Sequence, residues 1–368
     1  MDPYRRNLLK ASLAVPASLC LPVGFSEAAA GVQTPAHARG IGGGISVCEP
    51  FITTELAALY RSGDCSLVED RRAHAWAGRC LGSGRFAALL QDTTAERIAR
   101  MDAATIRLQV LTLPAPGVQL FTADRAAALA RSSNEQLAEI CAGRPERFAG
   151  LAVLAGSARQ AIRELEYACA LGLKGGVIHS GLQADATLSL PDSGILEAAA
   201  ALAVPLYIDP VLVHGITEGS AYATTVRLQL LALIHSGVLD RYPGLRLVAG
   251  AAGEDLGEWI RRLDTIQDQG VLTGMEQWRR GPKPARRITD YLRGQVYFTS
   301  RGMRGMESVR RAGAAMGAER LLFGSVYPEA APFTPLPGQL QDEISSRQFF
   351  RDNAMQVFSI RESTRILA

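Results

Sequence analysis

The chain has 368 residues, of which 48% are hydrophobic and 20% are charged, and its formal net charge is +3 at pH 7. These values describe a soluble globular protein with a sizeable core, built as one large α/β domain or as two smaller ones. The Lys and Arg residues are scattered along the sequence, so neither nucleic acid nor a membrane surface is expected as a partner. The six cysteines form no CxxC pair and no metal-finger spacing.

The first 30 residues follow the order of an export signal. The pair Arg5-Arg6 precedes a mildly apolar run over 11–23, and small residues at 28–30 provide a cleavage site. We therefore expect a twin-arginine signal peptide at 1–30 and a periplasmic, exported protein. A chance Arg pair before an apolar stretch is the alternative.

The apolar run at the N-terminus is too short, and too broken by Pro16 and Pro22, to span a bilayer. Residues 31–44 are rich in Gly, Pro and Ala and predict a flexible linker. The folded domain is then expected over 45–368.

After the linker, short apolar runs alternate with longer stretches of helical pattern. Helices are expected at 124–142, 158–171, 194–203 and 226–239. Eight buried strands are expected at 45–48, 106–113, 148–154, 175–179, 205–209, 245–250, 296–300 and 321–324. Eight such units predict an α/β fold of the (β/α)8 TIM-barrel type. A doubly wound sheet is the runner-up, but the first strand is not followed by a Gly-rich phosphate loop.

In a TIM barrel the chemistry is carried by the carboxyl ends of the strands. The residues expected there are Cys48, Glu49, Pro114, Ala155, His179, Ser180, Asp209, Pro210, 251–254, Ser300, Arg301 and 325–327. Two long insertions, 52–100 and 264–293, are candidates for lids or substrate walls, with surface packing as the simpler interpretation.

Several motifs resemble those of the amidohydrolase-related family, which includes resorcylate and aminocarboxymuconate-semialdehyde decarboxylases and has a metal-dependent hydrolase-like barrel. The similar stretches run from about residue 45 to 360. They are the loop at 111–119, the turn at 141–148, the strand entry at 235–245, Gly253-Glu254 with Arg262 and Asp264, and Asn353-Ala354. No single match is specific, but their order and spacing together are.

The resemblance implies one divalent metal, usually zinc, and this chain departs from the family at the ligand positions. Cys48 and Pro50 stand at the strand-one ligands, and Asp209 stands at the strand-five His. Ala251 replaces the strand-six His that takes part in catalysis, and Val326 replaces the strand-eight Asp. Catalytic zinc needs about three protein ligands, so we expect no cofactor and no metal at the family position.

The remaining candidates for proton transfer are Glu254, Asp209 and His179. Two carboxylates in one cavity can divide acid and base roles when their pKa values differ. The competing interpretations are an ion pair of Glu254 with Arg262 or Arg301, and a hydrogen-bonded His179 at the barrel rim.

Other residues at the mouth are candidates for substrate binding, namely Arg301, Tyr327, Ser300, Cys48 and Glu49. Arg301 suits an anionic carboxylate, because a guanidinium can bind it through two parallel hydrogen bonds. Cys48 is either a nucleophile, if its pKa is lowered, or a small buried hydrophobe.

The sequence thus predicts a metal-independent or repurposed lyase or hydrolase, decarboxylase-like, for a small anionic aromatic or lactone-like substrate. The alternatives are a non-catalytic binding protein that keeps the pocket, and a zinc enzyme with relocated ligands. The sequence does not determine the oligomeric state, and a homo-oligomer is compatible with it.

Overall fold

The computed structural model describes residues 43–63, 71–179, 191–209, 220–250, 253, 255–268, 284–303, 305–325, 327–328 and 347–361. The chain divides into two units, Met1–Gln33 and Thr34–Ala368. The expected signal peptide and all but the end of the expected linker lie outside the described residues.

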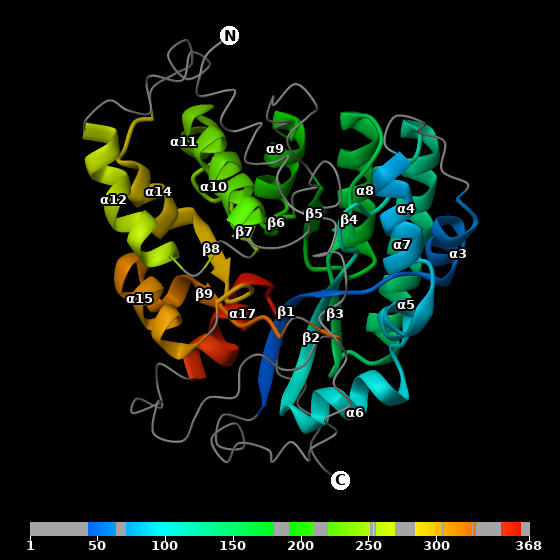
Figure 1. Ribbon diagram of the computed structural model, residues 1–368. Coiled ribbons are helices and arrows are strands. Elements are labelled where there is room, and N and C mark those ends of the chain that lie inside the picture. The colour runs from blue at the N-terminus through cyan, green and yellow to red at the C-terminus, as the bar shows by residue number, and fades with distance from the viewer. Residues whose placement is uncertain are drawn as a thin grey trace. The chain divides into compact units, whose positions relative to one another are not determined.

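Short parallel strands form the centre of the fold (Figure 1). They are β1 (Gly44–Pro50), β2 (Ile106–Thr112), β3 (Phe148–Gly150), β4 (Ala152–Val153), β5 (Gly176–Ile178), β6 (Leu206–Ile208), β7 (Leu247–Ala249), β8 (Val296–Thr299) and β9 (Leu321–Leu322). They pair in the orders β1-β2-β3 and β4-β5-β6-β7-β8-β9. Each expected apolar run contains one strand, or two in the case of 148–154, because these runs are buried on both faces.

Backbone hydrogen bonds join the two sets of strands. Between β3 and β4, the amide of Leu151 donates to Leu111 O at 2.9 Å, and the amide of Ala152 donates to Gly175 O at 2.8 Å. β3 and β4 are therefore one strand with a break at Leu151. At the other edge, Val47 N donates to Phe323 O at 2.9 Å, which places β1 beside the last strand. The (β/α)8 barrel expected from the sequence is confirmed.

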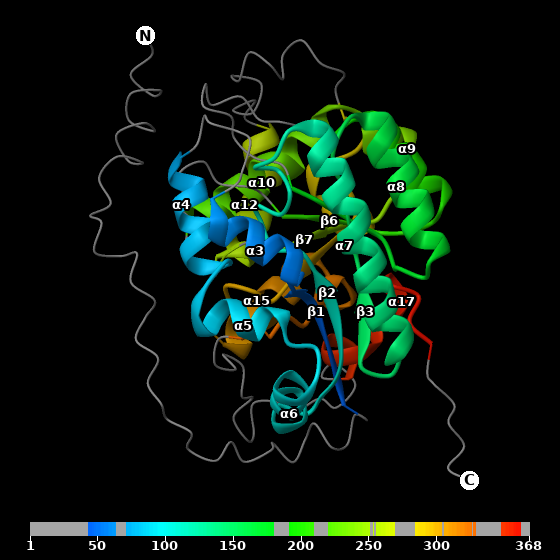
Figure 2. The same cartoon turned by 90° about the vertical axis from the view of Figure 1, so that its right-hand side faces the viewer.

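Helices lie around the strands, as Figures 1 and 2 show. The helices after β2 are α7 (Ala123–Gly143), α8 (Ala158–Ala170), α9 (Ser193–Ala201), α10 (Ser220–His235), α11 (Val238–Arg241), α12 (Leu256–Asp268), α14 (Ile288–Gln295), α15 (Met306–Met316) and α17 (Asn353–Val357). Short 3-10 and π segments cover Ala318–Arg320 and Gln348–Asp352. None of the helices in the described ranges is long and apolar enough to cross a membrane.

Helix boundaries follow local capping chemistry. α8 begins at a capping box, in which Ser157 accepts from the amide of Gln160 and the Gln160 side chain accepts from the amide of Ser157. The helix expected at 226–239 differs: it begins at Ser220 and ends at His235. Gly237 has φ 74°, a left-handed conformation that stops the helix before α11.

Within the described part of the insertion at 52–100, the chain forms α3 (Thr54–Ser62), α4 (Arg71–Cys80), α5 (Gly84–Gln91) and the start of α6 (Ala95–Ala103). Leu56, Tyr60 and Leu90 from this segment are buried in the main core. This part of the insertion therefore packs against the barrel. Of the second insertion, 269–283 lies outside the described residues.

Candidate active site

Asp209 and His179 meet at the carboxyl ends of neighbouring strands. His179 follows β5 and Asp209 follows β6, and these strands pair in parallel. The Nε2 atom of His179 lies 3.5 Å from Oδ2 of Asp209. Both residues are buried, at 8% and 3% exposure. Two of the three residues expected to transfer protons are thus in direct contact.

The Asp209 carboxylate accepts hydrogen bonds at both oxygens. The amide of Ala115 donates to Oδ2 at 3.0 Å, and the hydroxyl of Tyr222 donates to Oδ1. Burial alone would raise the pKa of Asp209. His179, Arg301 and the Tyr222 hydroxyl outweigh burial and hold that pKa below its usual value. Asp209 is therefore a buried carboxylate that hydrogen bonds and nearby positive charge keep ionised, and it is a weak base.

The ring of His179 is held by the loop that follows β2. Its Nε2 atom lies 3.0 Å from Leu113 O, and a carbonyl can only accept, so Nε2 carries a hydrogen. Its Nδ1 atom is buried and has no partner among the described residues. A Cβ added to Gly117 would lie 2.5 Å from Nδ1, so the glycine lets the backbone pass directly beside the ring. The side chain is 0% exposed. In this conformation His179 positions Asp209 rather than facing solvent.

Around Asp209 lie a thiol, two phenols and a guanidinium. Arg301 stands 6.0 Å above the ring of Tyr222. Burial raises the pKa of Cys48 well above its usual value, and the charges of Asp209 and Glu49 add to this. Burial, and then the charge of Asp209, likewise raise the pKa of Tyr207 and of Tyr222. These three groups stay protonated at neutral pH, which for Cys48 favours the small buried hydrophobe over the nucleophile.

Glu49 connects the ends of the first and last strands. Its Oε1 atom accepts from the amide of Ser325 at 2.6 Å and from the Ser325 hydroxyl at 2.9 Å, and also from the hydroxyl of Ser46. Its Oε2 atom accepts from the amide of Tyr327 at 2.8 Å. With 0% exposure, Glu49 orders the loop after β9.

Ser300 and Tyr327, both expected at the mouth as substrate-binding residues, also bond within the protein. The Ser300 hydroxyl accepts from the amide of Gly324 at 3.1 Å. The Tyr327 hydroxyl donates to Leu89 O at 3.1 Å, and the side chain is largely buried. Both contacts fix the backbone around β8 and β9 rather than leaving the hydroxyls open to a ligand.

Arg97 of α6 lies behind this part of the mouth with 0% exposure. It donates to Gln109 Oε1 at 2.7 Å and to Pro50 O at 2.9 Å, and its guanidinium stacks 4.0 Å from the centre of the Tyr327 ring. Burial lowers the pKa of Arg97 to about 10, which still leaves it charged at neutral pH.

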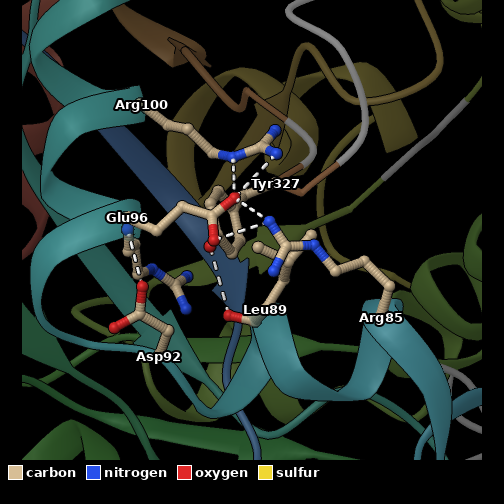
Figure 3. Close-up of polar contacts among 7 residues, drawn as sticks. Arg85, Leu89, Asp92, Glu96, Arg100 and Tyr327 are labelled. Atoms are coloured by element: carbon tan, nitrogen blue, oxygen red, sulfur yellow. Dashed lines mark hydrogen bonds and ion pairs between the residues drawn. The ribbon is translucent and has the colours of Figure 1, made fainter. Parts of the chain in front are cut away.

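Figure 3 shows the ion pairs of Glu96 on α6, beside Tyr327. There Arg85 and Arg100 share the carboxylate of Glu96 at 2.6 and 3.0 Å. Tyr327 lies next to this cluster, and its hydroxyl points to Leu89. The buried Arg97 and the ion pairs of Glu96 therefore lie around Tyr327, which follows β9 in the chain.

The remaining predicted residues lie outside the described part of the chain. These are Glu254, Ser180, Pro210, Ala251 and Val326. Sequence reasoning missed Tyr222, Tyr207 and Arg97. Tyr207 alone had a signal, because it lies two residues before Asp209 on the same strand and therefore on the same face.

The side chains at the expected ligand positions do not fit a divalent metal. Without a metal, burial and the charges of Asp209 and Glu49 raise the pKa of Cys48, so a metal ion would have to displace the thiol proton. Pro50 has no side-chain donor, and its carbonyl accepts from the charged Arg97. Asp209 already accepts from Ala115 and Tyr222. Among the described residues, no group of three or more His, Cys, Asp or Glu is arranged to hold a metal.

Sequence comparison identifies the family of the chain and relatives that are named as decarboxylases. The amidohydrolase family matches residues 70–360. Gamma-resorcylate decarboxylase of Rhodococcus jostii (strain RHA1) is 30% identical over 268 residues, covering 66% of this chain and 79% of the relative. The same-named enzyme of Polaromonas sp. (strain JS666 / ATCC BAA-500) is 31% identical over 263 residues, covering 65% and 78%.

Solved structures agree with the sequence comparison. 5-Carboxyvanillate decarboxylase of Novosphingobium aromaticivorans, solved with manganese and 4-hydroxy-3-methoxy-5-nitrobenzoic acid, gives a TM-score of 0.71 at 26% identity, covering 89% of this chain and 98% of that one. Dihydroxybenzoic acid decarboxylase of Polaromonas sp. JS666, solved with manganese and 2-nitroresorcinol, gives 0.66 at 25% identity, covering 89% and 100%. The barrel, the ordered motifs and these matches agree: the chain belongs to the amidohydrolase family and resembles its aromatic-acid decarboxylases.

Proposed function

We propose that this protein is a carbon–carbon lyase that decarboxylates a small carboxylated phenol without a metal at the family position. The buried Asp209–His179 contact carries the proposal, because it places a proton-bearing imidazole 3.5 Å from a carboxylate at the barrel mouth. The names of the relatives supply the substrate class. Arg301, whose charge acts on Asp209, supplies the cation for an anionic substrate.

Decarboxylation needs one proton and no redox partner. The bond between the ring carbon and the carboxyl carbon breaks, carbon dioxide leaves, and the electron pair that remains on the ring takes a proton. The proton comes from solvent: Asp209 Oδ2 takes it up, 3.5 Å from His179 Nε2, and the carboxylic acid so formed delivers it to the ring carbon, which returns Asp209 to its ionised form. Glu254, which follows the sixth barrel strand in the sequence, is a second candidate for this delivery.

Metal independence is part of the proposal. It rests on the donor chemistry at three of the family's ligand positions: Pro50 has no side-chain donor, and Cys48 and Asp209 alone supply fewer than the roughly three protein ligands that a catalytic metal needs. The alternative is a metalloenzyme with ligands relocated among Cys48, Asp209, His179 and Glu254.

The test compares a substitution of Asp209, which accepts from Tyr222, with a substitution of Asp240, which accepts from Tyr291. Purified protein is assayed for carbon dioxide release from 2,6-dihydroxybenzoate and from 5-carboxyvanillate. Asp209→Asn is expected to lower kcat by about 10²- to 10⁴-fold, the usual contribution of a positioned acid or base. The matched control is Asp240→Asn, since Asp240 accepts from Tyr291 at 2.6 Å among the outer helices. The control should leave kcat unchanged, and equal rates in the two variants would refute the assignment.

A second candidate function is binding without catalysis. It is favoured by one observation, namely that Asp209 already accepts from Ala115 and Tyr222 and is a weak base. A protein that binds both acids in calorimetry and releases no carbon dioxide from either would establish this function instead.

We further propose that the protein is exported through the twin-arginine signal at 1–30. The support is the order of Arg5-Arg6, the apolar run and the small residues at 28–30. Changing both arginines to lysine should retain the protein in the cytoplasm, as measured by fractionation. Unchanged export of that variant would contradict the proposal.

A further inference from the structure

The loop that follows β2 contacts both residues of the His179–Asp209 pair. Its carbonyl at Leu113 accepts from His179 Nε2 at 3.0 Å, and its amide at Ala115 donates to Asp209 Oδ2 at 3.0 Å. Further along the loop, the backbone of Gly117 passes beside the imidazole, where a Cβ would lie 2.5 Å from Nδ1. The relative position of the two side chains therefore depends on where this loop lies.

Tyr60 of α3 holds that loop from the insertion between β1 and β2. Its hydroxyl donates to the carbonyl oxygen of Gly117, 57 positions along the chain. Its ring stacks on that of Phe121, with the ring centroids 6.2 Å apart and an angle of 27° between the planes. One side chain thus contacts the loop at two points.

Tyr60 is itself well supported. It lies in the last turn of α3 and is 2% exposed. The helix begins at Thr53, whose side chain accepts from the amide of Leu56 at 3.1 Å. α4 packs so closely against α3 that a Cβ at Gly78 would lie 2.9 Å from the carbonyl oxygen of Tyr60. The phenol is therefore a fixed support for the loop.

We propose that Tyr60 is a positioning residue, which holds the β2 loop through the Gly117 carbonyl and so sets the geometry of the His179–Asp209 pair. The inference rests on the proposed function, since it concerns how that pair is placed for proton delivery. Small displacements of a catalytic group lower the rate steeply, because the reacting atoms must meet in the right geometry. The insertion at 52–100 thereby contributes to the site as well as packing against the barrel.

The experiment compares Tyr60→Phe with Tyr291→Phe in the full chain. Tyr291 is also buried, and its hydroxyl donates to Asp240 at 2.6 Å and accepts from the amide of Arg286 at 3.1 Å, among the outer helices. Each variant keeps the aromatic ring and removes one hydrogen-bonded hydroxyl. Hydrogen exchange of the amides at 115–121 is followed by mass spectrometry, and kcat and KM are measured with 2,6-dihydroxybenzoate and 5-carboxyvanillate.

Tyr60→Phe should speed exchange in the loop by about 3- to 10-fold, because the buried Gly117 carbonyl loses its donor and the loop opens more often. It should lower kcat by about 3- to 10-fold and change KM by less than about twofold, since the substitution displaces the reacting groups and removes no contact with the substrate. Tyr291→Phe should leave the loop exchange and both kinetic constants unchanged, although its melting temperature falls.

A double variant separates positioning from a general loss of stability. If Tyr60 acts only through the pair, Tyr60→Phe should lower the residual rate of Asp209→Asn by less than about twofold, because residues that act as one unit are not additive. A residual rate that falls as far as it does in the wild-type background would overturn the inference.

Two further results would also overturn it: loop exchange in Tyr60→Phe that equals that of wild type, or a loss of kcat in Tyr291→Phe as large as in Tyr60→Phe. Failure of the lyase proposal gives a different pattern, in which wild type releases no carbon dioxide from either acid. Exchange then decides the inference alone. Faster loop exchange in Tyr60→Phe, and not in Tyr291→Phe, keeps Tyr60 as the support of the pair.

Discussion

At the scale of single residues, Asp209 is held as an anion by the groups around it. The Ala115 amide, the Tyr222 hydroxyl and the neighbouring His179 come from the β2 loop, α10 and the end of β5. His179, Arg301 and the Tyr222 hydroxyl favour the charged form, and together they overcome the effect of burial on its pKa. In the proposed reaction the neighbouring His179 holds this carboxylate in place while it takes up and delivers a proton, so the two side chains act as one unit.

Gly117 is the residue that allows His179 its position. With φ 56° and with the imidazole 2.5 Å from an added Cβ, Gly117→Ala should lower the free energy of unfolding by about 2–4 kcal/mol, from the left-handed backbone and the collision together. The matched control is Gly63→Ala, at φ 70° with nothing within 4 Å, which should cost about 1–2 kcal/mol. Urea denaturation of both variants measures the difference. Equal losses in the free energy of unfolding would mean that the His179 ring moves away from the added Cβ without lowering stability.

At the scale of elements, α6 ties two strand ends together. Arg97 links the carbonyl that ends β1 to the Tyr327 ring that follows β9. Lysine cannot reproduce the planar stacking or the paired bonds, so Arg97→Lys should lower the free energy of unfolding by about 2–4 kcal/mol. Arg100→Lys, on the exposed side of the same helix, should cost about 0.5 kcal/mol or less. Thermal or urea denaturation that ranks the two variants equally would argue against a cross-linking role for Arg97.

The start of α6 predicts a pH dependence. The Asp92 carboxylate accepts from the amide of Thr94 at 2.7 Å and from that of Arg97 at 2.8 Å. Burial would raise its pKa, but these bonds and the Thr94 hydroxyl lower it. A lowered folded-state pKa means that the stabilisation is complete above the unfolded value of about 4 and is lost as the pH falls below it.

Asp92→Ala should therefore cost about 1 kcal/mol at pH 7, and the difference from wild type should shrink towards pH 3. Asp92→Asn keeps an acceptor and has no charge to titrate, which makes it the control. Urea denaturation across this pH range measures both. A difference between wild type and Asp92→Ala that stays constant down to pH 3 would contradict the role of the charge.

At the scale of the whole molecule, the barrel mouth is held together by hydrogen bonds. Glu49 connects β1 to the loop after β9, and Asp209 connects β6 to the β2 loop and α10. These contacts join strand ends that a shared metal would otherwise join. We therefore expect treatment with EDTA to leave both the melting temperature and the rate of carbon dioxide release unchanged. A fall in either that manganese or zinc restores would favour the metalloenzyme with relocated ligands.

The barrel was largely predictable, since each strand is a short apolar run and runs of this kind pack between helices and the barrel interior. The candidate site was predictable in part. Asp209 and His179 were recognised because each ends a strand, but Tyr222 follows a segment without periodic pattern. Arg97 lies in an amphipathic helix with several charged residues, and the sequence pattern does not show which of these residues is buried.

The amino-acid sequence alone determined the alternation of strands and helices and the identity of the side chains at the ligand positions, including the donor-free Pro50, Ala251 and Val326. Those properties are local, and they can be read from neighbouring residues. Only the tertiary structure decided that Asp209 accepts from Ala115, 94 positions away, and that Glu49 accepts from Tyr327, 278 positions away. The physical reason is that such pairs meet only when the strands close side by side, and closure depends on packing throughout the core.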